Sequence, residues 1–137
     1  MKWLSAAFLA LAAGSAAAAE LQVVVEGVQG REGNVRLALY NDPKTFRKEE
    51  KSLKVLAKPA SGDSVSFLFE GLQPGRYTLI AYHDADSNGK MNRFLGMIPT
   101  EGYGLSNNPQ VSGPPAFDDA DFELTEAGES VHIKLRY

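Results

Sequence analysis

Residues 64–81 read SVSFLFEGLQPGRYTLIA, and this stretch decides the fold class. Apolar side chains stand at every second position on both sides of a Gln73-Pro74-Gly75 turn: Val65, Phe67, Phe69, Tyr77, Leu79 and Ala81. A period of two is typical of strands that bury one face. The stretch therefore predicts two strands joined by a type II turn in which Gly75 takes positive φ.

The same alternation recurs through the rest of the chain. Further strands are expected near residues 21–25, 35–39, 53–56, 122–124 and 131–135. Helical patterns of any length are missing from the sequence between them. Seven short strands without long helices predict an all-β fold, a single seven-stranded antiparallel β-sandwich.

One stretch breaks the rhythm. Residues 84–118 contain few alternating apolar positions and many glycine, asparagine and proline residues. Long irregular segments are uncommon in compact domains and usually carry function. We therefore expect one long irregular loop at 84–118, and any binding surface is sought there first. Within this segment Phe94, Tyr103 and Phe117 are expected to pin the loop onto the sandwich.

The N-terminus has the pattern of a cleavable signal peptide. Lys2 supplies a positive charge, residues 3–11 are apolar, and Ala17 and Ala19 are the small residues that precede a cleavage site. The apolar run is shorter than the roughly 20 residues that a membrane-spanning helix needs. We expect a signal peptide at residues 1–19, cleavage between Ala19 and Glu20, and a mature domain at 20–137 without a transmembrane segment. Its expected location is periplasmic or secreted.

Composition narrows the class of partner. The chain has 14 basic and 17 acidic residues, a net charge of −3, and no cysteine. A net negative charge without a basic stripe argues against nucleic acid as a partner. Core packing without disulfides must carry the stability.

The clearest chemical motif opens the long loop. In the run HDADSNGKMN, at residues 83–92, Asp84, Asp86 and Asn88 fall at positions 1, 3 and 5 of a calcium loop, and the Lys90 carbonyl falls at position 7. Ca²⁺ is coordinated by several oxygen atoms, which alternating Asp and Asn residues around a glycine supply. Asn92 completes the candidate metal-binding set.

The calcium motif is incomplete, so two interpretations stay open. Leu95 stands where position 12 would require a glutamate. Residues from elsewhere could close the site, namely Glu101, Asp118, Asp119 or Asp121. The alternative is a solvated turn in which the Asp and Asn side chains bond their own backbone.

Four segments together resemble one bacterial family: Phe69–Tyr77, His83–Asn92, Gly96–Asn108 and Pro114–Ala120. This is the family of domain of unknown function 2141, and the resemblance covers essentially the whole mature chain. It implies an exported sandwich of prealbumin-like or immunoglobulin-like type, and it brings no established activity and no catalytic residues. Asn92 stands where relatives are expected to carry an acidic residue, which removes a charge from the calcium motif.

Two functions follow from these patterns. The first is a non-enzymatic exported binding or cell-envelope interaction module, stabilised by calcium if the motif binds it, whose partner is an envelope protein, peptide or glycan. The second is a small periplasmic hydrolase in which His83 acts as base and Ser106 as nucleophile. The sequence has no cysteine nucleophile, no G-x-S-x-G, no H-E-x-x-H and no phosphate loop. Because of these absences, the binding module is preferred.

Overall fold

Strands make up about half of the described residues. The computed structural model describes residues 18–87, 93–94, 98–99, 102–110 and 113–137. The strands are β1 (Ala19–Glu26), β2 (Asn34–Tyr40), β3 (Lys54–Pro59), β4 (Ser64–Leu72), β5 (Gly75–Asp84), β6 (Arg93–Phe94), β7 (Ile98–Pro99), β8 (Tyr103–Leu105), β9 (Phe122–Leu124) and β10 (Glu129–Lys134). The named helices are short, a 3-10 turn η2 (Glu49–Lys51) and α2 (Phe117–Ala120). No helix among the described residues is long and apolar enough to cross a membrane.

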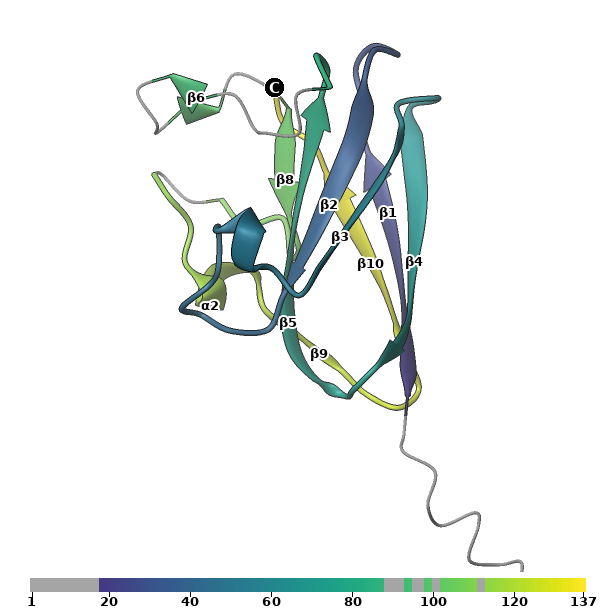
Figure 1. The fold of residues 1–137 in the computed structure, drawn as a ribbon, viewed down its shortest axis with the longest axis vertical. Helices are drawn as coiled ribbons and strands as arrows, with labels where there is room; N and C mark the ends of the chain where they lie inside the picture. The colour runs from purple at the N-terminus through teal and green to yellow at the C-terminus, as the bar shows by residue number, and fades with distance from the viewer. Residues whose placement is uncertain (1–17, 88–92, 95–97, 100–101, 111–112) are drawn as a thin grey trace, which may run out of the picture.

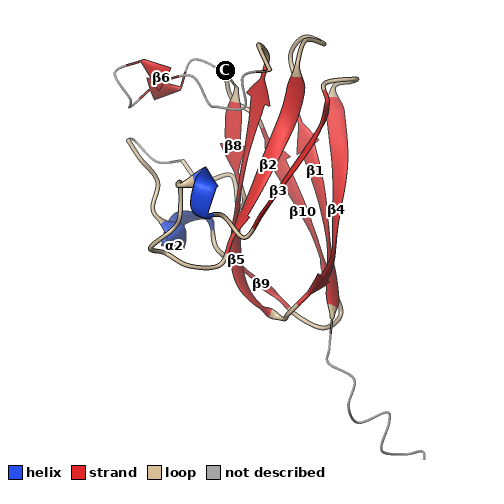
Figure 2. Cartoon of the chain, viewed as in Figure 1, coloured by secondary structure: helices blue, strands red, loops and turns tan. Residues whose placement is uncertain are grey.

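Two sheets face each other (Figures 1 and 2). The first has the strand order β10-β1-β4, and the second has the order β3-β2-β5-β8. Strand β9 pairs with the first residues of β5, while β8 pairs with the later residues 80–82. Separately, β6 and β7 form a two-stranded ribbon. The all-β, two-sheet prediction is confirmed.

The alternating residues of both sheets meet in one core. Its fully buried side chains come from β1, β2, β4, β5, β9 and β10: Leu21, Val23, Val25, Val35, Leu37, Leu39, Phe67, Phe69, Leu79, Ala81, Leu124 and Ile133. Burying one such aliphatic or aromatic side chain stabilises the fold by about 1.5–3 kcal/mol. Because the period is two, the register of each strand is set by this face.

The two sheets differ in what covers their outer faces. A second apolar cluster lies on the outside of the β3-β2-β5-β8 sheet and contains Ala38, Tyr40, Phe46, Ile80, Leu105, Phe117 and Ala120. The 41–53 segment and α2 supply its outer layer (Figure 2). Strand β5 is therefore buried on both faces. Phe117, 8% exposed, packs in this cluster, which confirms its predicted pinning role.

The predicted number of strands was too low. Each of the seven expected segments overlaps a strand, but β8 lies inside the stretch expected to be irregular, so the two sheets hold eight strands. Three residues are too few to show an alternation, and Gly104 interrupts them. A Cβ on Gly104 would lie 2.6 Å from the Lys134 carbonyl oxygen, so the close approach of β10 requires glycine here.

The prediction of a purely antiparallel sandwich was also wrong. Strand β10 pairs with β1 in parallel, from Leu21 opposite Glu129 to Glu26 opposite Lys134. Alternation fixes which face of a strand is buried and carries no information about the direction of its neighbour. Direction follows from the path of the chain, which enters β10 at the end where β1 begins (Figure 1).

The turn before β5 is only partly as predicted. Gly75 is absent from the glycines with positive φ, whereas Gly71, at the end of β4, has φ +70°. The left-handed residue is therefore placed at Gly71, and the expected type II geometry at Gly75 is wrong. Tyr77 anchors the corner, because its hydroxyl donates a hydrogen bond of 2.5 Å to the Gln73 carbonyl oxygen.

Candidate functional site

The predicted metal-binding residues begin at the end of β5. Asp84 is the last residue of the strand and is 1% exposed, whereas Asp86 is exposed in the following turn. Ser87, with φ 55°, donates its backbone N–H to the Asp84 carbonyl oxygen at 3.2 Å. The remaining predicted ligands, Asn88, Lys90 and Asn92, lie outside the described residues, as does Glu101.

The other residues expected to close the metal site lie in or beside α2. The Asp119 carboxylate accepts the Ala116 N–H at 2.7 Å, and Asp118 is exposed beside it. Helix α2 is held near Leu79, about 16 Å of strand away from Asp84. Among the described residues, no three His, Asp or Glu side chains gather where they could hold a metal ion. Calcium binding therefore stays a prediction that depends on Asp84, Asp86 and the segment after them.

His83, the candidate general base, sits in a closed polar network. It is 3% exposed, its Nδ1 lies 2.8 Å from the Tyr137 hydroxyl, and its Nε2 lies 2.7 Å from the Glu32 carbonyl oxygen. A carbonyl only accepts, so Nε2 donates to Glu32, and in the neutral imidazole Nδ1 is then the acceptor. Tyr137 therefore donates to His83 and accepts the Gln29 N–H at 2.8 Å. Both imidazole nitrogens are used in holding the β1–β2 loop and the C-terminus together.

Ser106, the candidate nucleophile, is also engaged elsewhere. It is fully buried, and its hydroxyl donates to the Ala120 carbonyl oxygen at 2.5 Å. The Ser106 hydroxyl oxygen also accepts the Leu79 N–H at 3.0 Å. His83 and Leu79 are four residues apart on β5, about 13 Å. The structure does not bring His83 and Ser106 together as a catalytic pair.

A second polar network, not predicted from the sequence, lies on the outer face of β2 and β5. The Tyr82 hydroxyl donates to Glu49 Oε1 at 2.9 Å and accepts from Arg36 Nε at 3.0 Å. Arg36 also forms an ion pair with Glu49 at 2.9 Å. Burial, followed by the hydrogen bond to Glu49, raises the pKa of Tyr82. The network fastens η2 onto the sheet, and its three members are too far apart in the sequence to form a recognisable motif.

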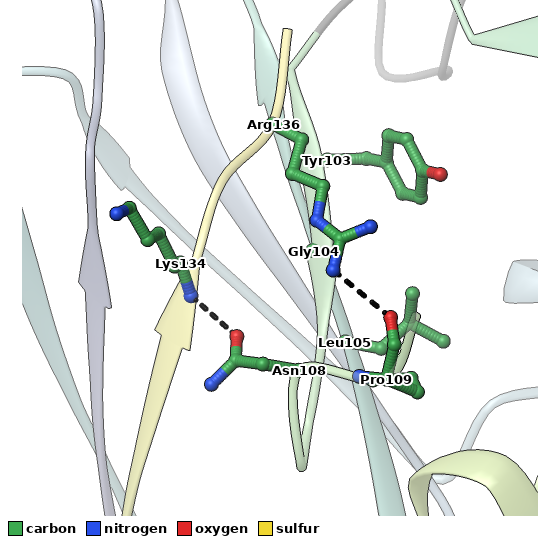
Figure 3. A pocket seen from close by; sticks show the side chains of 7 residues that line it. All are labelled: Tyr103, Gly104, Leu105, Asn108, Pro109, Lys134 and Arg136. Carbon is green, nitrogen blue, oxygen red and sulfur yellow. Dashed lines mark hydrogen bonds between the residues drawn. The ribbon is translucent and has the colours of Figure 1, made fainter. Parts of the chain in front are cut away.

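Strand β10 forms one wall of an open groove, which we call the β10 groove. Its lining residues are Glu26, Asn108, Gln110, Lys134 and Arg136, and its volume is about 490 Å³. A second hollow of only about 10 Å³ lies beside it, between β8 and β10 (Figure 3). The smaller hollow has room for about one water molecule, so of these two spaces beside β10 the groove is the one that can take a ligand.

Asn108 and Arg136 fix the shape of this groove. The Asn108 side-chain amide donates to the His132 carbonyl oxygen at 3.1 Å and accepts the Lys134 N–H at 2.8 Å. Arg136 donates from its guanidinium to the Pro109 carbonyl oxygen at 3.0 Å. Figure 3 draws this hydrogen bond and the one between Asn108 and Lys134. Asn108 has φ 44°, a left-handed conformation that asparagine tolerates better than most residues. The 107–110 segment is therefore held against β10 by side chains.

Charges in the β10 groove are unequally compensated. The Glu26 carboxylate oxygen Oε2 lies 2.9 Å from His132 Nδ1, so this carboxylate already has a partner. Among the ion pairs of the described residues, none uses Lys134 or Arg136. The groove can thus offer two cationic side chains and the Gln110 amide to an anionic or polar group. The sequence carries no motif that points to these two cations.

Comparison with known proteins places the chain in a family. No curated protein and no solved structure matches it. A family model does match, over residues 23–132, a range that runs from within β1 to within β10. The chain therefore belongs to the family described as an uncharacterized protein conserved in bacteria, DUF2141.

Proposed function

We propose that this chain is an exported, non-enzymatic binding module of the bacterial cell envelope. The module is a sandwich of immunoglobulin-like or prealbumin-like type that acts in the periplasm or after secretion. Its partner is an envelope protein, peptide or glycan that carries anionic groups. The β10 groove, with Lys134 and Arg136 along one wall, is the observation that carries this proposal.

The ligand chemistry follows from the groove's charges. An arginine guanidinium recognises a carboxylate or phosphate through paired hydrogen bonds, and a lysine ammonium adds a point charge. Arg136 uses one nitrogen on the Pro109 carbonyl, which orients the guanidinium before a ligand arrives. Preorientation lowers the entropy lost on binding. Glu26 at the same groove disfavours ligands of high negative charge density, so a single anionic group is the better fit.

The hydrolase alternative lacks this kind of support. A hydrolytic pair needs the base within hydrogen-bond reach of its nucleophile, about 2.6–3.2 Å. His83 is bonded to Tyr137 and Glu32, and Ser106 to Ala120 and Leu79. These contacts favour structural roles for both residues.

The binding proposal is tested by capture of envelope material on immobilised protein. The double variant Lys134→Gln with Arg136→Gln is compared with the wild-type chain and with Lys44→Gln, an exposed lysine in the distant 41–53 segment. We expect the double variant to lose the captured species and Lys44→Gln to retain it. Equal capture by all three proteins would refute the β10 groove as the binding site.

Export is tested by the mass of protein recovered from outside the cytoplasm. The expected product starts at Glu20. Ala19 opens β1, pairs with Leu72 and is 1% exposed, so cleavage after Ala19 removes one small buried residue from the edge of the core. A product that starts at Ala19 would support export with a cleavage site shifted by one residue. A chain that keeps residues 1–18 and stays in the cytoplasm would contradict the proposal.

Calcium is proposed as a stabilising ligand at the end of β5. Asp84 and Asp86 would supply carboxylates, Asn88 and Asn92 amide oxygens, and Lys90 its carbonyl, as oxygen-rich loops do for this ion. The support from the structure is that the strand delivers Asp84 directly into a tight turn at Asp86 and Ser87. Its test is given in the Discussion.

A further inference from the structure

The outer edges of the two sheets are protected to different degrees. An unprotected edge strand exposes backbone N–H and C=O groups that can pair with another chain. On β10 the Asn108 side-chain amide hydrogen-bonds the His132 carbonyl and the Lys134 N–H, so these two backbone groups are not available to another strand. Strand β3 has six residues that include Lys54, Lys58 and Pro59, the residue types that discourage edge pairing.

Strand β4 is the long edge that differs. It ends the order β10-β1-β4, spans nine residues and contains no proline and one charged residue, Glu70. Its pairing with β1 is regular from Ser64 to Phe69, and the register shifts only beyond that point. In the described part of the chain, the outer edge of this stretch is contacted by Lys58, whose Nζ donates a hydrogen bond of 2.5 Å to the Ser66 carbonyl oxygen.

That contact shows which backbone groups face outward. Along a strand, successive residues direct their N–H and C=O groups to opposite sides. The Ser66 carbonyl accepts from Lys58 at the outer edge. On β1 the Glu26 carbonyl is directed to the β10 side, where it accepts the Leu135 N–H, so Glu26 and its β4 partner Ser64 do not bond each other. By alternation, the groups of Ser64, Ser66 and Leu68 face away from the sheet. Those of Val65, Phe67 and Phe69 face β1. The free edge therefore carries a regular row of donors and acceptors.

The side chains along this edge suit a close neighbour. Ser64, Ser66 and Leu68 project on the solvent side of the sheet. Two are small, and the third, Leu68, is 46% exposed, one of the few large apolar side chains in the described residues that are exposed to this extent. Small and apolar side chains leave the backbone approachable, whereas charged ones would repel a second strand.

We propose that β4 pairs antiparallel with β4 of a second copy of this chain, which joins two three-stranded sheets into one. A two-fold axis at Phe67 overlaps the whole 64–70 stretch. Ser66 then faces Leu68 of the second copy, and Ser64 faces its Glu70. The residues that face each other in this register are those whose backbone groups point outward, so each pair can exchange two main-chain hydrogen bonds. The two Leu68 side chains become diagonal neighbours, about 7–8 Å apart, on the same face.

Lys58 competes with a second strand for this edge. Its ammonium donates a hydrogen bond to the Ser66 carbonyl oxygen and lies 5.5 Å from the centre of the Phe67 ring. Pairing requires Lys58 to leave Ser66, so the lysine weakens association without blocking it. Association should therefore be reversible and concentration-dependent.

Sedimentation over a range of protein concentrations tests the proposal with the chain as purified from expressing cells. The wild-type chain should convert from monomer to dimer as its concentration rises. Leu68→Lys places two like charges beside the two-fold axis and should shift the transition at least tenfold higher in concentration. Leu53→Lys alters a side chain that is 50% exposed outside the strands and should leave the transition unchanged. Lys58→Gln should lower the transition concentration.

Amide hydrogen exchange locates the contact. The Leu68 N–H faces the free edge and should exchange more slowly as the dimer forms, while the Phe67 N–H, directed at β1, serves as the internal control. Slowing at Leu68 that disappears in Leu68→Lys supports the pairing. A wild-type chain that stays monomeric at all concentrations, or a dimer that Leu68→Lys leaves intact, would overturn it. Thermal melts show that each variant is folded before it is compared.

Discussion

The Tyr137 hydroxyl donates a hydrogen bond of 2.8 Å to His83 Nδ1, across 54 positions of the chain. The contact ties the C-terminal residue to the end of β5. Tyr137 also accepts the Gln29 N–H, so one hydroxyl joins the β1–β2 loop, β5 and the C-terminus. This end of the sandwich is therefore held by polar contacts, and apolar packing dominates the middle.

Removing that hydroxyl should destabilise the fold. Tyr137→Phe keeps the ring, which is packed edge-on against the His83 ring at 6.0 Å, and leaves His83 Nδ1 and the Gln29 N–H without their partner. We expect a loss of about 1 kcal/mol in the free energy of unfolding, because solvent can replace part of the lost bonding. Urea unfolding measures it. Tyr103→Phe is the control and should change the midpoint little, because the Tyr103 hydroxyl makes no hydrogen bond to the described residues.

Stability should fall at alkaline pH through Tyr82. Its folded-state pKa is raised, first by burial and then by Glu49, above the unfolded value of about 10. The folded state thus holds a proton that the unfolded chain releases, so stability declines as pH rises above about 10. Tyr82→Phe should flatten this decline while Tyr103→Phe keeps it. Urea midpoints measured across the alkaline range would contradict the assignment if Tyr82→Phe had the wild-type slope.

Two glycines with the same backbone angle separate strain from crowding. Gly33 and Gly71 both have φ +70°. A Cβ on Gly33 would lie 2.0 Å from the Asp84 carbonyl oxygen, whereas a Cβ on Gly71 would have no atom within 4 Å. Gly71→Ala should cost about 1 kcal/mol through φ alone. Gly33→Ala should cost about 1–3 kcal/mol more, because backbone must move. Equal unfolding midpoints for the two variants would contradict this, because they would show that the β1–β2 loop can move to admit a Cβ without lowering the free energy of unfolding.

Calcium should raise the melting temperature if the turn after β5 binds it. Extracellular sites typically have dissociation constants of about 10⁻⁴–10⁻³ M. Linkage gives about 0.4 kcal/mol when free calcium equals the dissociation constant, and about 2.7 kcal/mol at a hundredfold excess. Melts in chelator and in millimolar Ca²⁺ should differ by a few degrees, with a smaller effect of Mg²⁺.

The variant Asp86→Ala decides whether the predicted loop is responsible. Asp86 is exposed, so its removal should not unfold the domain, yet the calcium-dependent rise should vanish. Asp63→Ala, an exposed carboxylate paired with Arg31, is the control and should keep the rise. Identical wild-type melts with and without calcium would leave residues 83–92 as a turn whose polar side chains bond the backbone.

Sequence alone determined the class of fold and the positions of most strands. The alternation at Val65, Phe67 and Phe69 is local, because the residues of one strand are enough to show which of its faces is buried. The corner hydrogen bond of Tyr77 is equally local, since its partner Gln73 is four residues away. The loop aromatic Phe117 could be assigned to packing on residue type.

Tertiary structure decided what depends on distant neighbours. The parallel pairing of β1 with β10, the Tyr137–His83 contact and the Asn108 amide on β10 each join residues more than twenty positions apart. A hydrogen bond of this kind leaves no periodic trace in the sequence, because one hydroxyl or amide at one position is enough to make it. His83 and Ser106 were catalytic candidates by residue type, and only the tertiary structure shows that each is buried and bonded to other partners. The β10 groove emerged only when the chain brought Lys134 and Arg136 against Asn108 and Gln110.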